Sequence, residues 1–374
     1  MTLLHQTPPW RYLMLGSLLF FLPLLAMRLA ATGSAWQTVG LPEQSVRHVA
    51  TGFADGLFFY YAWTPTDGLM QASASAPGGD AERRVWRPID DALPGNGVWG
   101  APEVHRLAVD THNGRHVLVT LAADNQSGLY SSNDGGANWQ LMRSFAGSDQ
   151  NPVVGLGPVG AVYLADNQRL LVNLDGGNLW QQTPAWRAEV GPATVILVSE
   201  GRSDGVVDPA QPQVLLGTAG GYILRLPSPL ADHWEESQRL AAGAVTLLAE
   251  AAAQPAHLYA WGQGALFAST DAGASWAAIP YSMDGIGPIA PSAPADEVQA
   301  QALVVTADDP TTLYLALAGA GIMVSRDRGF SWQPLDRGRR PGAVHALTFD
   351  RRGSYLLAAT DQGIWRFPLF PAAR

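Results

Sequence analysis

The octapeptide "SNDGGANW" at Ser132–Trp139 recurs in three related forms along the chain. These are "NLDGGNLW" at Asn173–Trp180, "STDAGASW" at Ser269–Trp276 and "SRDRGFSW" at Ser325–Trp332. An Asp in a turn can accept bonds from the amides of its own turn, a Gly can adopt a positive φ, and a Trp can bury its indole between sheets. The pattern therefore predicts one structural turn used four times, built from Ser132, Asp134, Gly136 and Trp139; Asn173, Asp175, Gly177 and Trp180; Ser269, Asp271, Gly273 and Trp276; and Ser325, Asp327, Gly329 and Trp332.

A four-stranded unit surrounds each octapeptide. "HVLVTLAADNQSGLYSS" (His116–Ser132) reads as strand, turn and strand leading into the first octapeptide, and "VHRLAVDTHNG" (Val104–Gly114) adds a strand before it. Weaker copies without the octapeptide end at Trp86 and Trp234. A four-stranded repeat with a period of roughly 40 to 55 residues is typical of a β-propeller blade. We expect an all-β protein with seven blades, or six if the segment 151–185 merges with a neighbour.

The two ends of the repeat region are complementary. The last repeat, "SYLLAATDQGIWRFPLF", stops without its own octapeptide or final strand, whereas "GSAWQTVGLP" (Gly33–Pro42) matches the tail of a repeat. An N-terminal strand that completes the last blade would close the ring and cover two sheet edges. We therefore expect residues 33–374 to form one propeller, with Trp36 alongside the segment near Trp365.

Residues 1–32 are expected to form one hydrophobic helix. The apolar run "YLMLGSLLFFLPLLAM" (Tyr12–Met27) lies between Arg11 and Arg28. As a helix it spans roughly 24 Å, short of the ~30 Å hydrocarbon core, although Arg28 could snorkel. A signal anchor and a cleaved signal peptide both fit this run. Either way we expect export, with the propeller held on the outer side of the cytoplasmic membrane or secreted.

The composition restricts the function. The 23 basic residues are all Arg, and 32 acidic residues give a formal net charge of −9, which argues against nucleic-acid binding through a general positive field. The absence of Cys excludes disulfides and thiolate metal sites. One carboxylate per octapeptide is too few for a Ca²⁺ ion. We therefore expect no metal and no cofactor.

The octapeptides resemble the Asp-box, or bacterial neuraminidase repeat (BNR). This repeat is found in sialidases, sortilin-type ectodomains and the photosystem II assembly and stability-factor propellers, and the last of these are the most similar to this chain. The resemblance covers nearly everything from Gly33 to Arg374. It implies a β-propeller in which the boxes are structural staples on the blade rim, away from any active site.

The set of residues that sialidases use for catalysis is not recognisable in this chain. Such an enzyme requires three arginines around a carboxylate, a Tyr–Glu pair and an Asp acid, and its Arg-Ile-Pro signature is absent, because "WRPI" (Trp86–Ile89) has the wrong order. Tyr60 and Tyr61 are expected in an aromatic core. We predict no catalytic residues.

Basic residues and histidines recur at the start of the first strand in three repeats. "VRHVAT", "VHRLAV" and "VHALTF" carry them at equivalent places in the blades that closure makes neighbours, and "DRGRRPG" lies just before the last. One interpretation is an anion-binding patch on an otherwise acidic protein, and the other is arginines scattered over loops of a Lys-free chain. The candidate binding residues are Arg47, His48, His105, Arg106, Arg337, Arg339, Arg340 and His345.

These observations favour a non-catalytic, membrane-tethered binding scaffold or assembly factor. Its expected partners are a membrane protein or a subunit of a membrane complex, and the bilayer through the N-terminal helix. The alternative is an exported glycoside hydrolase or a carbohydrate-binding propeller. The Pro-rich insertions at Gly201–Gln213 and Asp284–Gln299 are expected to be loops.

Overall fold

The computed structural model of the 374-residue chain defines the ring of the propeller. It describes residues 36–75, 85–94, 103–110, 113–122, 127–145, 152–157, 160–166, 168–176, 179–203, 206–229, 231–251, 254–284, 287–289, 299–307, 309–335, 342–350 and 354–369. The expected N-terminal helix, Gly177, Arg337, Arg339 and Arg340 lie outside these residues. Among the described residues, no helix has the length and apolar character needed to cross a membrane.

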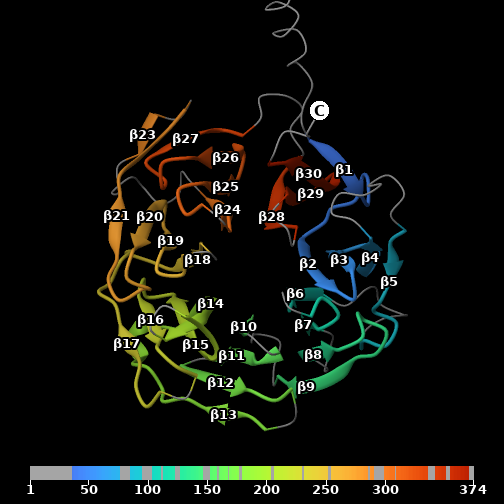
Figure 1. The fold of residues 1–374 in the computed structure, drawn as a ribbon, viewed down its shortest axis with the longest axis horizontal. Coiled ribbons are helices and arrows are strands. Elements are labelled where there is room, and N and C mark those ends of the chain that lie inside the picture. The colour runs from blue at the N-terminus through green and yellow to red at the C-terminus, as the bar shows by residue number, and fades with distance from the viewer. Residues whose placement is uncertain are drawn as a thin grey trace, which may run out of the picture.

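Seven sheets are arranged around a central axis, as Figure 1 shows. In each blade the first strand lies innermost and its successors pair antiparallel outward. Blade 1 contains β2 (His48–Ala54), β3 (Leu57–Thr64), β4 (Gly68–Ala74) and β5 (Arg87–Pro88). Blade 2 contains β6 (Glu103–Val109), β7 (Val117–Ala122), β8 (Gly128–Ser132) and β9 (Gln140–Ser144). Blade 3 contains β10 (Val153–Leu156), β11 (Val162–Asp166), β12 (Arg169–Asn173) and β13 (Gln181–Gln182), so the segment 151–185 forms a blade of its own.

The remaining blades follow the same order. Blade 4 contains β14 (Ala193–Ser203), β15 (Val206–Thr218), β16 (Ile223–Leu226) and β17 (Glu235–Glu236), preceded by the 3₁₀ turn η4 (Ala188–Val190). Blade 5 contains β18 (Val245–Glu250), β19 (Leu258–Gly262), β20 (Ala265–Ser269) and β21 (Ala277–Ile279). Blade 6 contains β24 (Ala300–Val305), β25 (Leu313–Leu317), β26 (Gly321–Ser325) and β27 (Ser331–Pro334), extended by β22 (Tyr281–Met283) and β23 (Gly287–Ile289). Blade 7 contains β28 (Val344–Phe349), β29 (Tyr355–Thr360), β30 (Gly363–Pro368) and β1 (Gln37–Gly40).

The predicted closure is confirmed. β1 pairs antiparallel with β30, with Thr38 opposite Trp365 and Gln37 opposite Arg366. The Arg366 Nε donates to the Gln37 side-chain oxygen at 2.9 Å. Trp36 is buried, and its ring lies 5.3 Å from that of Phe367. The N-terminal strand therefore completes the last blade and leaves no gap in the ring.

The core lies between neighbouring blades because the middle strands are apolar on both faces. Tyr61 and Trp63 of blade 1 pack in one cluster with Val117 and Val119 of blade 2. Tyr60 and Tyr61 are 2 % and 0 % exposed, as expected. The Tyr61 hydroxyl donates to the Gly114 carbonyl of the next blade at 2.8 Å, which satisfies its one polar atom.

The octapeptide turns link the third and fourth strands of their blades. In the third turn, the Ser269 hydroxyl donates to Asp271 Oδ1 at 2.7 Å and accepts from the Gly273 amide at 2.8 Å. Asp271 Oδ1 also accepts from the Ser275 amide at 2.8 Å. The first and fourth turns form the same three bonds. These bonds agree with the predicted structural role of the Ser, Asp and Gly positions.

The ring has two different faces because strands alternate in direction. The innermost strands begin at one face, here called the mouth face, which also receives the loops that enter each blade. They end at the other, the octapeptide face, where the third strand also ends. In the first turn the Gly135 amide donates to Arg115 of the loop after β6, which confirms that the two connections share this face.

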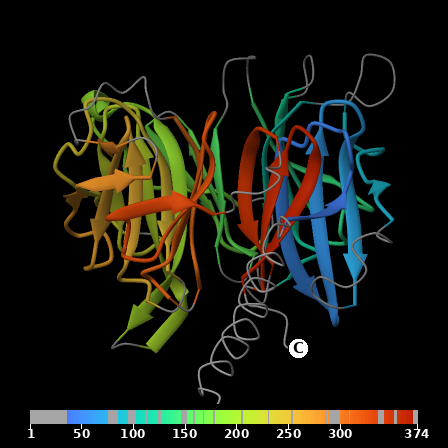
Figure 2. The same ribbon diagram turned by 90° about the horizontal axis from the view of Figure 1, so that it is seen from above.

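One of the two insertions was predicted wrongly as a loop. Residues 201–203 and 206–213 belong to β14 and β15, which pair from Ala193–Thr218 to Ser203–Val206 and extend this blade beyond the octapeptide face, as Figure 2 shows. The other insertion was also expected to be a loop, but its residues Gly287–Ile289 form β23, which pairs with β22 just before the insertion; β22 also runs parallel to β27.

Candidate functional site at the channel mouth

Five of the seven innermost strands have a β-bulge near the point where they enter the ring. The pairing register shifts by one residue at the start of β6, β14, β18, β24 and β28. A bulge leaves one residue out of the ladder and redirects its side chain. The bulged residues are His105, Thr194, Thr246, Gln301 and His345. In blade 1, Arg47 takes the equivalent place just before β2, with its amide donating to Trp63 O at 3.0 Å.

Blades 7, 1 and 2 bring the described candidate residues together. We call Arg47, His48, His105, Arg106 and His345 the mouth cluster. Arg47 Nη1 lies 3.3 Å from His345 Nδ1, and Arg106, His105 and His345 all lie close enough to His48 to interact with it electrostatically. The structure therefore brings these five residues to the same part of the ring, and their role in binding stays a prediction. Arg337, Arg339 and Arg340 fall in the stretch between β27 and β28 that is not described.

His345 holds the tip of Arg47 through one nitrogen and a carboxylate through the other. A guanidinium can only donate, so His345 Nδ1 accepts from Arg47 and Nε2 carries the proton. His345 Nε2 donates to Asp361 Oδ1 at 2.7 Å, and the Ser45 hydroxyl donates to the same oxygen at 2.9 Å. The bond from His345 is the main cause that lowers the pKa of Asp361. The chain Arg47–His345–Asp361 thus presents one guanidinium at the seam between blades 7 and 1.

His48 is a neutral histidine with a structural bond. Its Nε2 lies 3.1 Å from the Val104 carbonyl of the next blade, so Nε2 carries a proton, and its ring lies 5.9 Å from that of Trp63. Burial, and then the charge of Arg106, lower the pKa of His48 to about 4. In blade 4 the Thr194 hydroxyl donates in the same way to Val245 O of the following blade. His48 therefore joins two blades and at neutral pH adds no charge to the site.

Arg106 is a cation without a carboxylate partner among the described residues. It is partly buried, and burial lowers its pKa, although a guanidinium remains charged throughout the accessible pH range. Its Nη1 donates a long hydrogen bond of 3.4 Å to His105 O. A partly desolvated guanidinium attracts an anion more strongly than an exposed one does. Arg106 therefore gives the mouth its clearest capacity to bind an anionic group.

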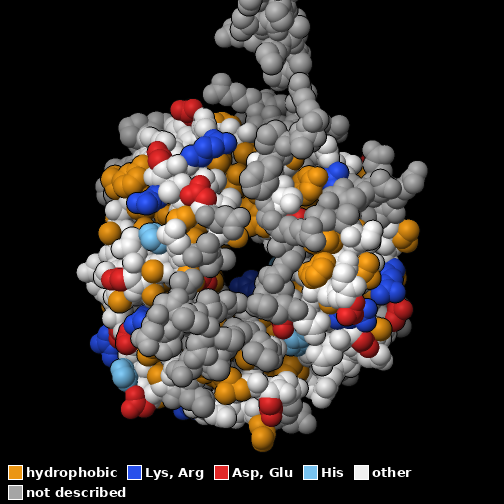
Figure 3. All heavy atoms as spheres, viewed as in Figure 1, with side chains coloured by type: hydrophobic (Ala, Val, Ile, Leu, Met, Phe, Trp, Pro, Cys, Tyr) orange, Lys and Arg blue, Asp and Glu red, His pale blue; other side chains and the backbone are white. Residues whose placement is uncertain are grey.

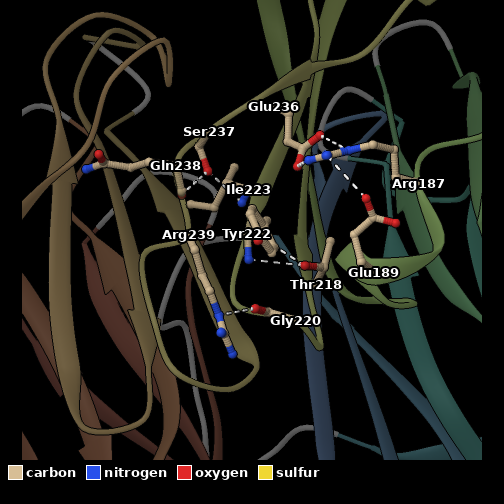
Figure 4. A network of polar contacts seen from close by, with 10 residues as sticks. All are labelled: Arg187, Glu189, Thr218, Gly220, Tyr222, Ile223, Glu236, Ser237, Gln238 and Arg239. Atoms are coloured by element: carbon tan, nitrogen blue, oxygen red, sulfur yellow. Dashed lines mark hydrogen bonds and ion pairs between the residues drawn. The ribbon is translucent and has the colours of Figure 1, made fainter.

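Another arginine of the mouth face shows the contrasting arrangement. Arg187, just before η4, donates through Nε to Glu236 Oε2 at 3.0 Å and lies 3.2 Å from Glu189 Oε1, as Figure 4 shows. Both carboxylates belong to the same surface, so the charge of Arg187 is neutralised locally. Arg106 has no such pair within the described part of the chain, and this difference separates the two sites.

A cavity with a mostly aliphatic lining lies inside the ring, towards the ends of the innermost strands at the octapeptide face. It has a volume of about 520 Å³ and is lined by the innermost strands of blades 1, 2, 3, 4 and 7. Most lining residues are aliphatic, among them Val49, Leu107 and Ile196, with Asp350 at the far end of β28. Figure 3 shows the opening at the centre of the ring, with an arginine side chain inside it. A partner segment held at the mouth would therefore have to pass the mouth cluster to place apolar groups in this cavity.

The sequence prediction missed Asp361 and Ser45. Asp361 lies in the tight turn "DQG" between β29 and β30, and second-to-third-strand turns of every blade lie on the mouth face. Once strand polarity is considered, a turn Asp beside a first-strand His is a signal that could have identified it. Ser45 directly precedes the aligned segment "VRHVAT", so its position also offered a signal.

No protein-family model and no curated protein matches the chain by sequence. Several solved structures match its fold. YCF48 bound to a D1 peptide superimposes with a TM-score of 0.58 at 14% identity, covering 91% of this chain and 96% of that one. YCF48 from Cyanidioschyzon merolae gives 0.59 at 13% identity, covering 89% and 98%.

A glycoside hydrolase also shares the fold. The GH74 xyloglucanase from Xanthomonas campestris gives a TM-score of 0.64 at 17% identity, covering 91% of this chain but 55% of that one. At such identities the likeness concerns architecture alone. The chain is thus similar in fold both to a propeller solved with a peptide and to part of an enzyme, and it is itself a seven-bladed β-propeller.

Proposed function

We propose that this protein is a non-catalytic, membrane-tethered scaffold or assembly factor that holds an acidic segment of a membrane-protein partner at the mouth cluster. The observation that carries this proposal is the Arg106 guanidinium, which is partly buried and lacks a carboxylate partner among the described residues. Arg47 adds a second guanidinium at the same mouth. The chain has a net charge of −9, so two cations at the mouth make this face a favourable place for an anionic partner to bind.

The geometry suits recognition of a carboxylate or a similar planar anion. Guanidinium groups can donate two parallel bonds to a carboxylate, and such charge-assisted bonds are about twice as strong as neutral ones. His48 stays neutral and its Nε2 is bonded to the Val104 carbonyl, so it shapes the site without competing for the ligand. The cavity with a mostly aliphatic lining lies deeper in the ring and would take aliphatic side chains of a segment that enters from the mouth. The partner class is therefore a peptide segment with acidic and apolar residues.

The solved structure of YCF48 with a D1 peptide supports this proposal by analogy of architecture. It shows that a propeller of similar shape holds a peptide. The tether comes from the apolar run Tyr12–Met27, which ends a few residues before Trp36 enters β1. A retained helix would keep the ring at the outer surface of the cytoplasmic membrane, where membrane-protein segments are within reach.

Carbohydrate binding or hydrolysis is the second candidate, favoured by the fold shared with the GH74 xyloglucanase. Glycoside hydrolysis generally uses two carboxylates that flank the scissile bond. The described lining of the cavity contributes one, Asp350, and one aromatic side chain, Phe349. For this reason the peptide scaffold is the preferred proposal.

Affinity purification of the full chain from solubilised membranes tests the proposal. We expect wild-type protein to recover a membrane protein, and Arg106→Glu to recover at least tenfold less, as expected for loss of a charge-assisted bond and added repulsion. Arg239→Glu is the matched control, because Arg239 is an exposed arginine on the same face whose Nε and Nη2 donate to Gly220 and Ala242 carbonyls. Figure 4 shows its bond to Gly220.

Three outcomes would overturn the proposal. These are undiminished capture by Arg106→Glu, equal loss in both variants, or release of sugars from a polysaccharide by the wild-type chain. The last of these would establish the second candidate instead. The mass of the recovered wild-type chain reports in the same experiment whether residues 1–32 are retained.

A further inference from the structure

The fourth octapeptide turn differs from the others at the positions that the turn leaves exposed. Ser325, Asp327 and Gly329 form the same bonds as in the first and third turns, so the scaffold of the turn is unchanged. Its variable positions carry two arginines and a phenylalanine, Arg326, Arg328 and Phe330. The equivalent residues are Asn133, Gly135 and Ala137 in the first turn and Thr270, Ala272 and Ala274 in the third.

The three variable side chains of the fourth turn face solvent. Phe330 is 52% exposed, which is unusual for a large aromatic side chain, and both arginines are exposed. The carboxylates nearby are engaged: Asp327 accepts from Ser325 and Ser331, and Asp309 accepts from Thr311 and Thr312. The charge of Arg328 helps to lower the pKa of Asp309, after the bonds from Thr311 and Thr312. No described carboxylate forms an ion pair with Arg326 or Arg328.

The backbone of Arg328 adds a second, independent observation. Its φ is 65°, in the left-handed region; the equivalent residues are Gly135 and Gly176 in the first two turns, with φ of 78° and 67°, and Ala272 in the third, with φ of 57°. A side chain at this place is unfavourable by comparison with glycine. An arginine is therefore present where the turn itself would favour glycine.

The chain enters the structure next to this turn. β1 runs antiparallel to β30, so it begins at the octapeptide face, and Trp36 packs in one cluster with Tyr314, Ile322 and Val324 of blade 6. Val324 directly precedes Ser325, the first residue of the fourth turn. From Arg28, at the end of the apolar run, to Trp36 an extended chain reaches at most roughly 29 Å. A retained N-terminal helix thus holds the bilayer surface close to Arg326, Arg328 and Phe330.

We infer that Arg326, Arg328 and Phe330 form a membrane-contact site that binds the surface of a bilayer containing anionic lipids. The two guanidinium groups bind headgroup phosphates, and the Phe330 ring enters the boundary between headgroups and acyl chains. The inference rests on the proposed function only in taking the N-terminal helix as retained. It goes further by giving the ring an orientation: the octapeptide face near blades 6 and 7 meets the membrane, and the mouth cluster points away from it.

Site-specific fluorescence in vesicles tests this inference. The chain has no cysteine, so a single introduced one can carry an environment-sensitive dye such as NBD. Full-length Phe330→Cys is compared with Ala137→Cys. Ala137 is exposed and takes the same place in the first turn, which belongs to blade 2. Both are reconstituted into phosphatidylcholine vesicles with or without phosphatidylglycerol, and the vesicle-bound protein is isolated by flotation.

We expect the dye at position 330 to shift to the blue and to be quenched by lipid-borne quenchers in vesicles with phosphatidylglycerol. The dye at position 137 should remain in water in both compositions. Replacing Arg326 with Gln and Arg328 with Gly in the labelled protein should weaken the local contact about fivefold per arginine. Arg328→Gly alone should not lower the thermal unfolding midpoint, because it relieves the left-handed backbone, and this separates lipid binding from folding.

Three results would overturn the inference. One is a dye at position 330 that stays in water while the protein floats with the vesicles. Another is equal quenching at positions 137 and 330. The third is quenching at position 330 that depends neither on phosphatidylglycerol nor on the two arginines. If the wild-type chain does not float with vesicles at all, the tether of the proposed function fails as well. Arg106→Glu, on the opposite face, should leave the quenching unchanged.

Discussion

The mouth face and the octapeptide face are built from the same repeat but depart from it in different ways. On the octapeptide face, three turns repeat the same Ser–Asp–Gly bonds within about 0.1 Å of one another. On the mouth face, the bulged residue changes from Thr194 and Thr246 to His105 and His345 around the ring. Residues that are the same from blade to blade maintain the structure of the blade. The residues that depart from this pattern on each face are the candidate binding residues.

The largest effect is expected from removing a repeated tryptophan. Trp332 is 2% exposed, and its indole donates to Gly329 O at 2.9 Å, so Trp332→Ala should lower the free energy of unfolding by about 3–5 kcal/mol. Trp180 belongs to the most divergent turn, is only partly buried, and its indole N–H has no described acceptor. Trp180→Ala should therefore cost clearly less. Urea unfolding of both variants measures the difference, and equal losses would show that the turns do not differ in their structural role.

The next effect is a loss of stability in acid that originates at the mouth. The pKa of His48 is about 4 in the folded chain against an ordinary 6.5, so between these values the unfolded chain binds more protons. Stability should therefore fall as the pH drops from 6.5 towards 4, by up to about 3 kcal/mol. His48→Gln keeps an N–H for Val104 O and should flatten this dependence, as measured by urea unfolding at several pH values.

The matched control for His48 is His233→Gln. The His233 side chain is 70% exposed and lies far from the mouth cluster in blade 4. This variant should keep the wild-type dependence on pH. If His48→Gln also keeps it, the assignment of a buried, neutral His48 is wrong.

The smallest effects are expected at two neighbouring residues of the fourth turn. Gly329 has a φ of 92°, and an added Cβ would lie 2.4 Å from Leu266 Cδ2, so Gly329→Ala should destabilise the chain by about 2 kcal/mol. Arg328 also has a positive φ but is exposed, so Arg328→Gly should stabilise it by about 0.5–1 kcal/mol. Thermal unfolding of the two variants should shift the midpoint in opposite directions. A shift in the same direction would remove the argument that Arg328 is retained at a cost to stability.

More of the ring than of the candidate site could be predicted from the sequence. The tail of a repeat at Trp36 and the unfinished repeat at Trp365 were sufficient for the closure, because sheet edges must be covered. The polarity of the first strands placed Arg47, His105 and His345 together. These predictions depend on the order of the strands, which can be inferred from a repeated sequence.

Other features depend on local geometry that a single sequence does not display. The bulges that redirect His105 and His345 are visible only in the pairing register. Asp361 lies in a turn 16 residues after His345, and only the polarity of the strands, not the sequence of the turn itself, relates it to that histidine. The insertion Gly201–Gln213 was predicted as a loop because of its prolines, but a hairpin that projects beyond its sheet has unpaired edges, which tolerate proline.

Hydrogen–deuterium exchange on the full-length chain, with and without its captured partner in the membrane, tests the central claim most directly. The account predicts that the partner slows exchange at residues 45–50, 103–109 and 344–349 and leaves the first and third octapeptide turns unchanged. Slower exchange confined to the octapeptide face, with the starts of β2, β6 and β28 unchanged, would contradict it.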